Sequence, residues 1–273
     1  MLISYRYFVR DDDEADVHTR EFFCPRKVTV SDVHELASAI MPGTEITLEG
    51  GTYDFSMLAS DEETNWFFHD DYIDNFNWTI LADRISLKPA DGEKVRVVIG
   101  NPYAPVLDFT NSSNIWITDL TCGHNEDVGP CGAPVIRFND GNHLNVSGCS
   151  LYGCGSYGIM ADGGRTIDFK NTEIYGCSQG AAYFSGSSEA LFDKCFIHDN
   201  EISASGLFYC YGSSSLYVRD SKIMKNTGED ESLICSYEYS DVLFKNCRFL
   251  SNAYDLLSES DREDGVLFEG CSW

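Results

Sequence analysis

The residues best suited to acid–base chemistry in this sequence lie in one long turn and on two nearby strands. His124, Glu126 and Asp127 fall close together in the turn. A histidine beside two carboxylates can transfer protons or bind a cation. Because we expect this turn to open towards Arg137 and Asp162, we predict that His124, Asp162 and Arg137 carry catalysis if the protein is an enzyme. In the alternative interpretation, His124 only shapes the turn and the two carboxylates are solvated.

A second candidate site is a column of apolar and aromatic side chains along the third strand of a repeat. Successive repeats place outwards Arg137, Met160, Tyr183, Phe208, Ile234 and Leu257. An exposed stripe of this kind is normally covered by something. A loop of the same chain, a partner subunit or second copy, and a sugar stacked on the rings are the three alternatives. The predicted ligand-binding residues are Tyr183, Phe208, Met160, Glu126 and Asp127.

The next outward column limits what an enzyme could do here. Its members are Asn139, Asp162, Ser185, Cys210, Ser236 and Glu259. A glycosidase needs two carboxylates that act together as acid and base, but Asp140 and Glu259 lie coils away from Asp162. A lyase needs a base and a neutraliser for the uronate, and only Arg137 and Arg165 are basic nearby. The sequence therefore shows no clear catalytic constellation.

These columns follow from an internal repeat. An alternating apolar segment begins at Ile115 and recurs as far as Val266 at intervals of 23 to 29 residues. A fixed period of this size is typical of solenoids, and alternation with a period of two indicates strands. Each repeat contains three such segments, separated by turns rich in Gly, Asn and Asp. The sequence predicts an all-β fold, a single-stranded right-handed parallel β-helix with three strands and 23 to 29 residues per coil.

The first strand of each repeat also carries an outward column of alternating charge. Its members are Thr118, Ser147, Lys170, Asp193, Arg219 and Lys245. Opposite charges one coil apart can pair across parallel strands. We interpret this column as a structural ladder and not as a site.

The two ends of the repeat region differ. Asp32 and Glu35 are spaced as a capping box at the start of a short helix. A helix over the first coil hides its unpaired edge. We therefore predict an N-terminal extension at 1–27 and a β-helix at 28–273 with an N-terminal capping helix. No capping element follows the last strand at Trp273, so either the chain is cut there or a partner, such as a second copy, covers the last coil.

Composition excludes several kinds of ligand. The formal net charge is −25, whereas nucleic acid binding needs a basic footprint, so we expect no nucleic acid partner. An anionic polysaccharide would need calcium to bridge the like charges, and calcium is the one cofactor we consider. We predict no metal site built from protein ligands. We also expect no membrane span, because no stretch approaches about 20 apolar residues.

The chain has 11 cysteines, most of them at repeat positions. Cys149 and Cys195 share a position two coils apart, about 9.6 Å, which is beyond disulfide reach. Cys247 and Cys271 are one coil apart and within reach. We interpret the thiols as small apolar core residues, and no CxxC pair is present for zinc. A thiol-rich core favours a reducing setting, and the N-terminus lacks the pattern of a signal peptide.

Several segments resemble known proteins. The segments 122–131, 151–159 and 174–181 are similar to bacterial right-handed parallel β-helix repeat proteins, a group without established activity. Residues 32–53 resemble the opening of the pectin lyase-like superfamily. The resemblance implies the fold, a substrate groove along the third strand, and a cell-surface or secreted location. It does not fix a function, because this fold hosts lyases, hydrolases, epimerases, adhesins and tailspikes.

Three functions stay open at this point. The first is recognition of a glycan or a protein surface along the third-strand face, without catalysis. The second is a polysaccharide lyase or glycoside hydrolase acting through His124, Asp162 and Arg137. The third is a structural scaffold that self-associates through its open C-terminal coil.

Overall fold

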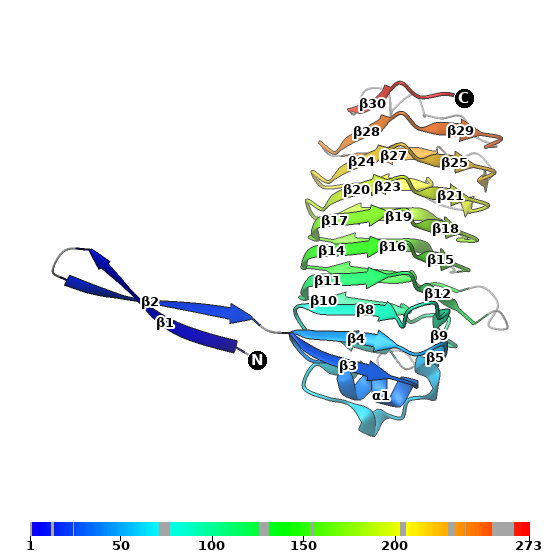
Figure 1. Ribbon diagram of the computed structural model, residues 1–273. Helices are drawn as coiled ribbons and strands as arrows, with labels where there is room; N and C mark the ends of the chain where they lie inside the picture. Colours follow the sequence, from blue (N-terminus) through cyan, green and yellow to red (C-terminus); the bar gives the residue numbers. More distant parts are fainter. Residues whose placement is uncertain are drawn as a thin grey trace.

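In a computed structural model the chain winds into stacked coils, and each coil contributes strands to parallel sheets that run the length of the stack (Figure 1). The structure describes residues 2–11, 14–23, 25–70, 77–125, 131–153, 156–202, 206–228, 233–237, 239–252 and 265–273. The predicted all-β solenoid with three strands per coil is confirmed. We name its three large sheets the first, second and third sheet, in the order in which a coil visits them.

The first sheet has ten strands, namely β3 (Arg26–Val30), β4 (Thr44–Leu48), β8 (Ile85–Pro89), β11 (Ser113–Thr118), β14 (Asn142–Ser147), β17 (Arg165–Lys170), β20 (Glu189–Asp193), β24 (Ser215–Arg219), β28 (Asp241–Lys245) and β30 (Val266–Glu269). The second has eight, namely β5 (Gly51–Asp54), β9 (Val95–Ile99), β12 (Thr121–His124), β15 (Ser150–Tyr152), β18 (Glu173–Tyr175), β21 (Phe196–His198), β25 (Lys222–Met224) and β29 (Arg248–Leu250).

The third sheet also has eight strands, namely β6 (Phe67–Asp70), β7 (Asn77–Ile80), β10 (Leu107–Thr110), β13 (Ile136–Asn139), β16 (Tyr157–Asp162), β19 (Gly180–Ser185), β23 (Phe208–Cys210) and β27 (Ile234–Ser236). Only β6 and β7 pair antiparallel in it. The remaining elements are the hairpin β1 (Leu2–Asp11) and β2 (Glu14–Phe23), the pair β22 (Glu201–Ile202) and β26 (Thr227–Gly228), helix α1 (Val33–Ala39), and the 3₁₀ turns η1 (Phe55–Met57) and η2 (Ser60–Glu62).

The core is a set of columns that run parallel to the stack. Apolar residues at alternate positions of each strand point inwards and meet the same position of the next coil. Phe169 and Phe192, for example, are paired in register and stack with ring centroids 4.7 Å apart and planes 4° apart. This separation matches the spacing of about 4.8 Å between hydrogen-bonded strands. The sequence period therefore fixes which side chains are neighbours in space.

The turns keep the coils in register. A residue with left-handed backbone joins the first strand to the second in successive coils, and this position is occupied by Asp119, Gly148, Asn171, Lys194, Asp220, Asn246 and Gly270. The next turn contains a ladder in which the backbone N–H of Asn200 donates to Asn226 Oδ1 at 3.2 Å and that of Asn226 donates to Asn252 Oδ1 at 3.1 Å. Buried amides paired in this way fix one coil on the next.

The cysteines fill core positions. Of the nine that the structure describes, seven are buried. The Sγ of Cys149 lies 3.6 Å from the carbonyl oxygen of Ile117, to which it donates a weak hydrogen bond. Burial raises the pKa of Cys149 and of Cys195 to about 12, so both are protonated at neutral pH. This supports the interpretation of these residues as small core side chains.

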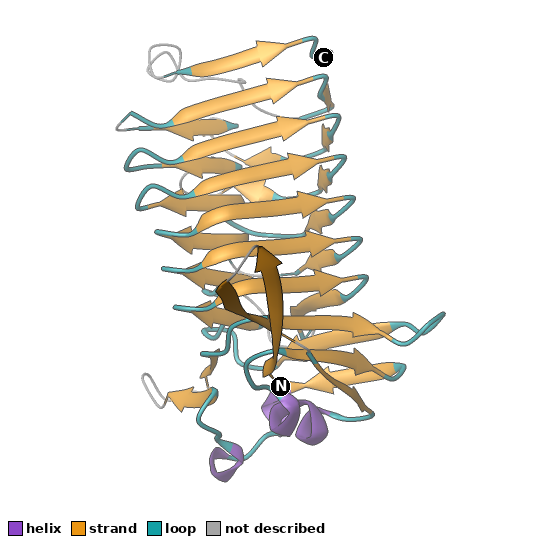
Figure 2. Cartoon of the chain, turned by 60° about the vertical axis from the view of Figure 1, so that its left-hand side comes forward, coloured by secondary structure: helices purple, strands orange, loops and turns teal. Residues whose placement is uncertain are grey.

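Helix α1 closes the N-terminal end of the stack, as predicted (Figure 2). Asp32 caps it by accepting a hydrogen bond from the Glu35 N–H at 2.8 Å. The Glu35 carboxylate accepts from the backbone N–H of Ser31, one residue before the position that a capping box requires. The hairpin β1–β2 stands away from the coils in Figure 1. At the other end, β30 pairs with β28, and association through this coil stays a prediction.

Candidate functional site

The outer face of the third sheet carries the predicted ligand-binding column. Arg137 pairs with Met160, Met160 with Tyr183, and Tyr183 with Tyr209, so the four side chains lie on consecutive coils. All four are half-buried, whereas the residues directly before and after each of them in its strand are buried and belong to the inner face. Arg137, Met160 and Tyr183 therefore share one outward column, as the alternation predicts.

The predicted outward position of Phe208 is wrong. Phe208 is fully buried and pairs with Ala182 and Ile234, which are also in the core. Tyr183 pairs with Tyr209, one residue further along the chain than the spacing assumed. A slip of one residue moves every side chain of a strand to the other face. Ile234, Cys210 and Ser236 are buried for the same reason, so their predicted outward positions are also wrong.

In the sequence, the turns that follow the strands of the third sheet contain the signal that gives the correct register. Gly186 and Gly212 both adopt left-handed backbone, and each lies three residues after an outward tyrosine, Tyr183 or Tyr209. If the two coils are aligned on these glycines, Tyr183 falls opposite Tyr209. The spacing assumed from the preceding coil instead places Phe208 opposite Tyr183. The remaining members of the two columns, Leu257 and Glu259, lie outside the described residues.

With this correction, tyrosines dominate the C-terminal coils of the third sheet. Tyr183 and Tyr209 stack with centroids 4.7 Å apart and planes 6° apart. Tyr209 contacts Tyr237 at 5.8 Å, and Tyr211 and Tyr237 are each 39% exposed. We call Tyr183, Tyr209, Tyr211 and Tyr237 the tyrosine face. Tyr183 and Tyr209 are one coil apart, whereas Tyr237 lies diagonally from Tyr209, because Cys235 is the residue in register with Tyr209.

Polar groups border the tyrosine face on the preceding coils. Asp162 is exposed, and its Oδ1 accepts a hydrogen bond from Ser185 Oγ at 3.0 Å. The guanidinium of Arg137 lies 3.3 Å from the carboxylate of Asp108, which is buried. Asp108 also accepts hydrogen bonds from Thr79 and Thr110. Asp162 and Arg137 are thus on the same face, and of the two carboxylates Asp108 and Asp162, Asp162 is the one exposed to solvent.

His124 lies elsewhere. It ends β12 in the second sheet, its side chain is 1% exposed, and its Nε2 donates to the carbonyl oxygen of Ala104 at 2.9 Å. Burial lowers the pKa of His124, which keeps the ring neutral at pH 7. The structure does not bring this ring to the face that Arg137 and Asp162 share. The catalytic roles of the three residues stay predictions, as do the roles of Glu126 and Asp127, which lie outside the described residues.

A histidine that the sequence reasoning missed lies on the second sheet. His198 Nε2 is 2.8 Å from Glu173 Oε1, and His198 Nδ1 is 2.6 Å from Asp199 Oδ2. The ring also stacks on Tyr175 at 5.2 Å. The recurrence of Tyr152, Tyr175 and His198 every 23 residues would have revealed this column. Within the described part of the chain, no three His, Cys, Asp or Glu side chains are grouped closely enough to hold a metal.

Comparison with known proteins agrees with this geometry. The chain belongs to the family described as "right handed beta helix region", which matches residues 134–273. It is similar to a pectate lyase from Paenibacillus sp. 0602, with 9% identity, a TM-score of 0.54 and coverage of 82% of this chain and 70% of that one. It is also similar to a pectin methylesterase solved with a hexasaccharide, with 12% identity, a TM-score of 0.55 and coverage of 87% and 83%.

At such low identity these two structures establish the fold alone. They are consistent with the predicted resemblance to the pectin lyase-like superfamily. No curated protein matches the chain in sequence. In the part of the chain that the structure describes, no helix combines the length and the apolar character needed to cross a membrane.

The buried His124 gives a prediction about pH. Its folded pKa lies below the ordinary value of 6.5, so the unfolded chain binds the proton more readily. The stability that neutral His124 contributes is therefore complete above about pH 6.5 and is lost as the pH falls towards the folded pKa. Urea unfolding at pH 7.5 and 5.5 should show a larger loss of stability in the wild type than in His124→Gln. His143 is exposed, so His143→Gln serves as the control and should lose as much stability between pH 7.5 and 5.5 as the wild type. An equally large loss in His124→Gln would contradict the buried neutral ring.

Proposed function

We propose that this protein binds a polysaccharide chain on the tyrosine face, with the polymer running along the stack. The observation that carries the proposal is the parallel pair Tyr183–Tyr209, which offers aromatic surface at 4.7 Å intervals. Sugar rings have apolar C–H faces that pack on aromatic rings, and polar groups at the border fix their orientation. Asp162 and Ser185 supply such groups next to Tyr183.

The geometry favours a linear ligand over a compact one. Tyr183 and Tyr209 occupy the same position on consecutive coils, and Tyr237 extends the aromatic surface to the coil after them. A regular polymer can contact several coils at once, and each contact adds to the total affinity. Polysaccharide-related proteins with the same fold are consistent with a ligand of this class.

The negative net charge of the chain favours neutral polysaccharides over anionic ones as ligands. With 44 Asp and Glu against 19 Lys and Arg, the protein repels a polyuronate at neutral pH. Neutral glycans carry no such cost. We therefore propose a neutral polysaccharide as the ligand, and expect polygalacturonate to bind only when calcium is added to bridge the like charges.

Binding should depend on the two stacked rings. We expect Tyr183→Ala/Tyr209→Ala to weaken binding to a neutral polysaccharide by at least about tenfold, because each ring buries a large apolar area. Affinity electrophoresis against glucan, galactan, mannan and xylan gels measures this. Tyr103→Ala is the matched control, because Tyr103 is 62% exposed but lies outside the tyrosine face. Equal retardation of the wild type and the double variant in every gel would refute the proposal.

A second candidate is a polysaccharide lyase or glycoside hydrolase that uses the same face. The exposed Asp162 beside the tyrosines favours it, since a catalytic carboxylate must reach the bound sugar. Among the residues that the structure describes, the strands of the third sheet offer Asp162 no second exposed carboxylate, because the neighbouring Asp108 is buried beneath Arg137 and the exposed Asp140 lies in the turn after β13. We therefore propose recognition as the main function and catalysis as the alternative.

Product analysis separates the two functions. Incubation with neutral polysaccharides and with polygalacturonate plus calcium should release no new reducing ends and no unsaturated uronate absorbing near 235 nm. Asp162→Asn should retain most of the binding affinity, because the tyrosine face is unchanged. Release of product by the wild type, abolished in Asp162→Asn, would instead establish the enzyme.

A further inference from the structure

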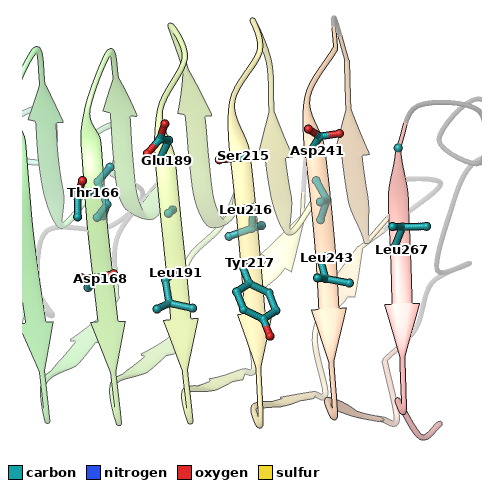
Figure 3. Close-up of a pocket in the computed structure, with 14 residues that line it drawn as sticks. Thr166, Asp168, Glu189, Leu191, Ser215, Leu216, Tyr217, Asp241, Leu243 and Leu267 are labelled. Atoms are coloured by element: carbon teal, nitrogen blue, oxygen red, sulfur yellow. The ribbon is translucent and has the colours of Figure 1, made fainter.

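The outer face of the first sheet contains a hollow that the proposed function does not use. It lies over β17, β20, β24, β28 and β30 and has a volume of about 450 Å³ (Figure 3). Its floor is one in-register column of outward side chains, in which Leu191, Tyr217, Leu243 and Leu267 occupy consecutive coils. The first three are half-buried, and Leu267 is 61% exposed. An apolar strip of this length on a soluble surface marks a contact site.

One rim of the hollow is acidic. Glu189 and Asp241 begin their strands on the same side, with Ser215 between them on the intervening coil, as Figure 3 shows. Asp168 continues the floor column on the coil before Leu191. The side chains that line the hollow include these three carboxylates and no Lys or Arg. Both rim carboxylates are exposed, and no ion pair joins them to another described residue.

The opposite rim is already neutralised. There Arg219 contacts Asp193 at 3.0 Å, as the predicted charge ladder expects, and Lys245 contacts Glu269, which was not part of that prediction, at 3.1 Å. The hollow is thus apolar along its floor, neutral along one edge and negative along the other. This asymmetry defines the ligand it fits, because a cation can be placed only along the edge of Glu189 and Asp241.

The floor does not suit a sugar polymer. Three of its four consecutive side chains are leucines, and only Tyr217 offers a ring, whereas the tyrosine face offers several. A second copy of this chain is also unsuited, because each copy has a net charge of −25. The N-terminal hairpin is no better, since residues 2–23 contain three arginines against six acidic residues. Charge complementarity requires an occupant that is basic as well as apolar.

We propose that the hollow binds an extended, basic and apolar peptide segment of a partner protein, with its cations three residues apart. Glu189 and Asp241 are two coils apart, about 9.6 Å. A polyproline-II helix rises about 3.1 Å per residue and repeats its side-chain direction every third residue, so cations at positions i and i+3 are about 9.3 Å apart. Both then face the acidic rim, while the intervening apolar residues rest on Leu191, Tyr217 and Leu243.

The test uses a fluorescein-labelled peptide of three Lys-Leu-Pro repeats and the full-length protein. Fluorescence anisotropy should show saturable binding that weakens as salt is raised from 50 to 300 mM. The variant Glu189→Gln/Asp241→Asn should weaken binding by about tenfold, and Leu243→Ser should weaken it as well. The control Asp61→Asn/Glu201→Gln makes the same charge change at exposed positions outside the hollow and should bind like the wild type.

Two altered peptides test the chemistry of the ligand. Acetylation of the lysines should abolish binding, and a peptide of the same composition with its lysines two residues apart should bind several-fold more weakly. The proposal is overturned if the wild type does not bind the first peptide at 1 mM, or if the hollow and control variants bind it equally. It is also overturned if sedimentation shows a dimer of the wild type that Leu243→Ser dissociates, since a second copy then fills the hollow.

Discussion

Stacking of coils in register is the constraint on which the rest of this structure depends. Parallel strands about 4.8 Å apart satisfy the backbone of each coil only if equivalent residues lie directly above one another. Every position of the repeat then becomes a column, so a functional surface is built one residue per coil. The stacked pairs Phe169–Phe192 in the core and Tyr183–Tyr209 on the surface are the same geometry on opposite sides of the sheets.

The same constraint explains how far the sequence could predict the structure. The fold, the core positions of the cysteines and the charge ladder depend on the repeat alone, whereas the capping helix follows from the spacing of Asp32 and Glu35, and the structure has each of them. Phe208 was assigned to the wrong face because the coil that contains it is longer than the two directly before it. In a regular strand an error of one residue exchanges the inner and outer faces completely. His124 is two residues after the inward Cys122 in the same strand, so the alternation itself predicts the buried ring that the structure shows.

The outer faces of the three sheets differ in chemistry, although one scaffold carries them all. The third sheet presents tyrosines bordered by Asp162, and the first presents leucines bordered by Glu189 and Asp241. The second stacks His198 on Tyr175 between two carboxylates. A solenoid can vary one outward column without disturbing the others, because the inward columns alone hold the coils together. This independence allows a glycan and a peptide to occupy different faces of one molecule.

Hydroxyl-radical footprinting of the tyrosines tests the central claim most directly, because it reports on each ring separately in the unmodified protein. In the presence of a saturating neutral oligosaccharide, oxidation of Tyr183, Tyr209, Tyr211 and Tyr237 should fall together. Tyr217 on the first sheet and the exposed Tyr103 should be oxidised as in the free protein. Protection of Tyr217 without protection of Tyr183 and Tyr209 would contradict the account, because the glycan would then lie on the first sheet and not on the tyrosine face.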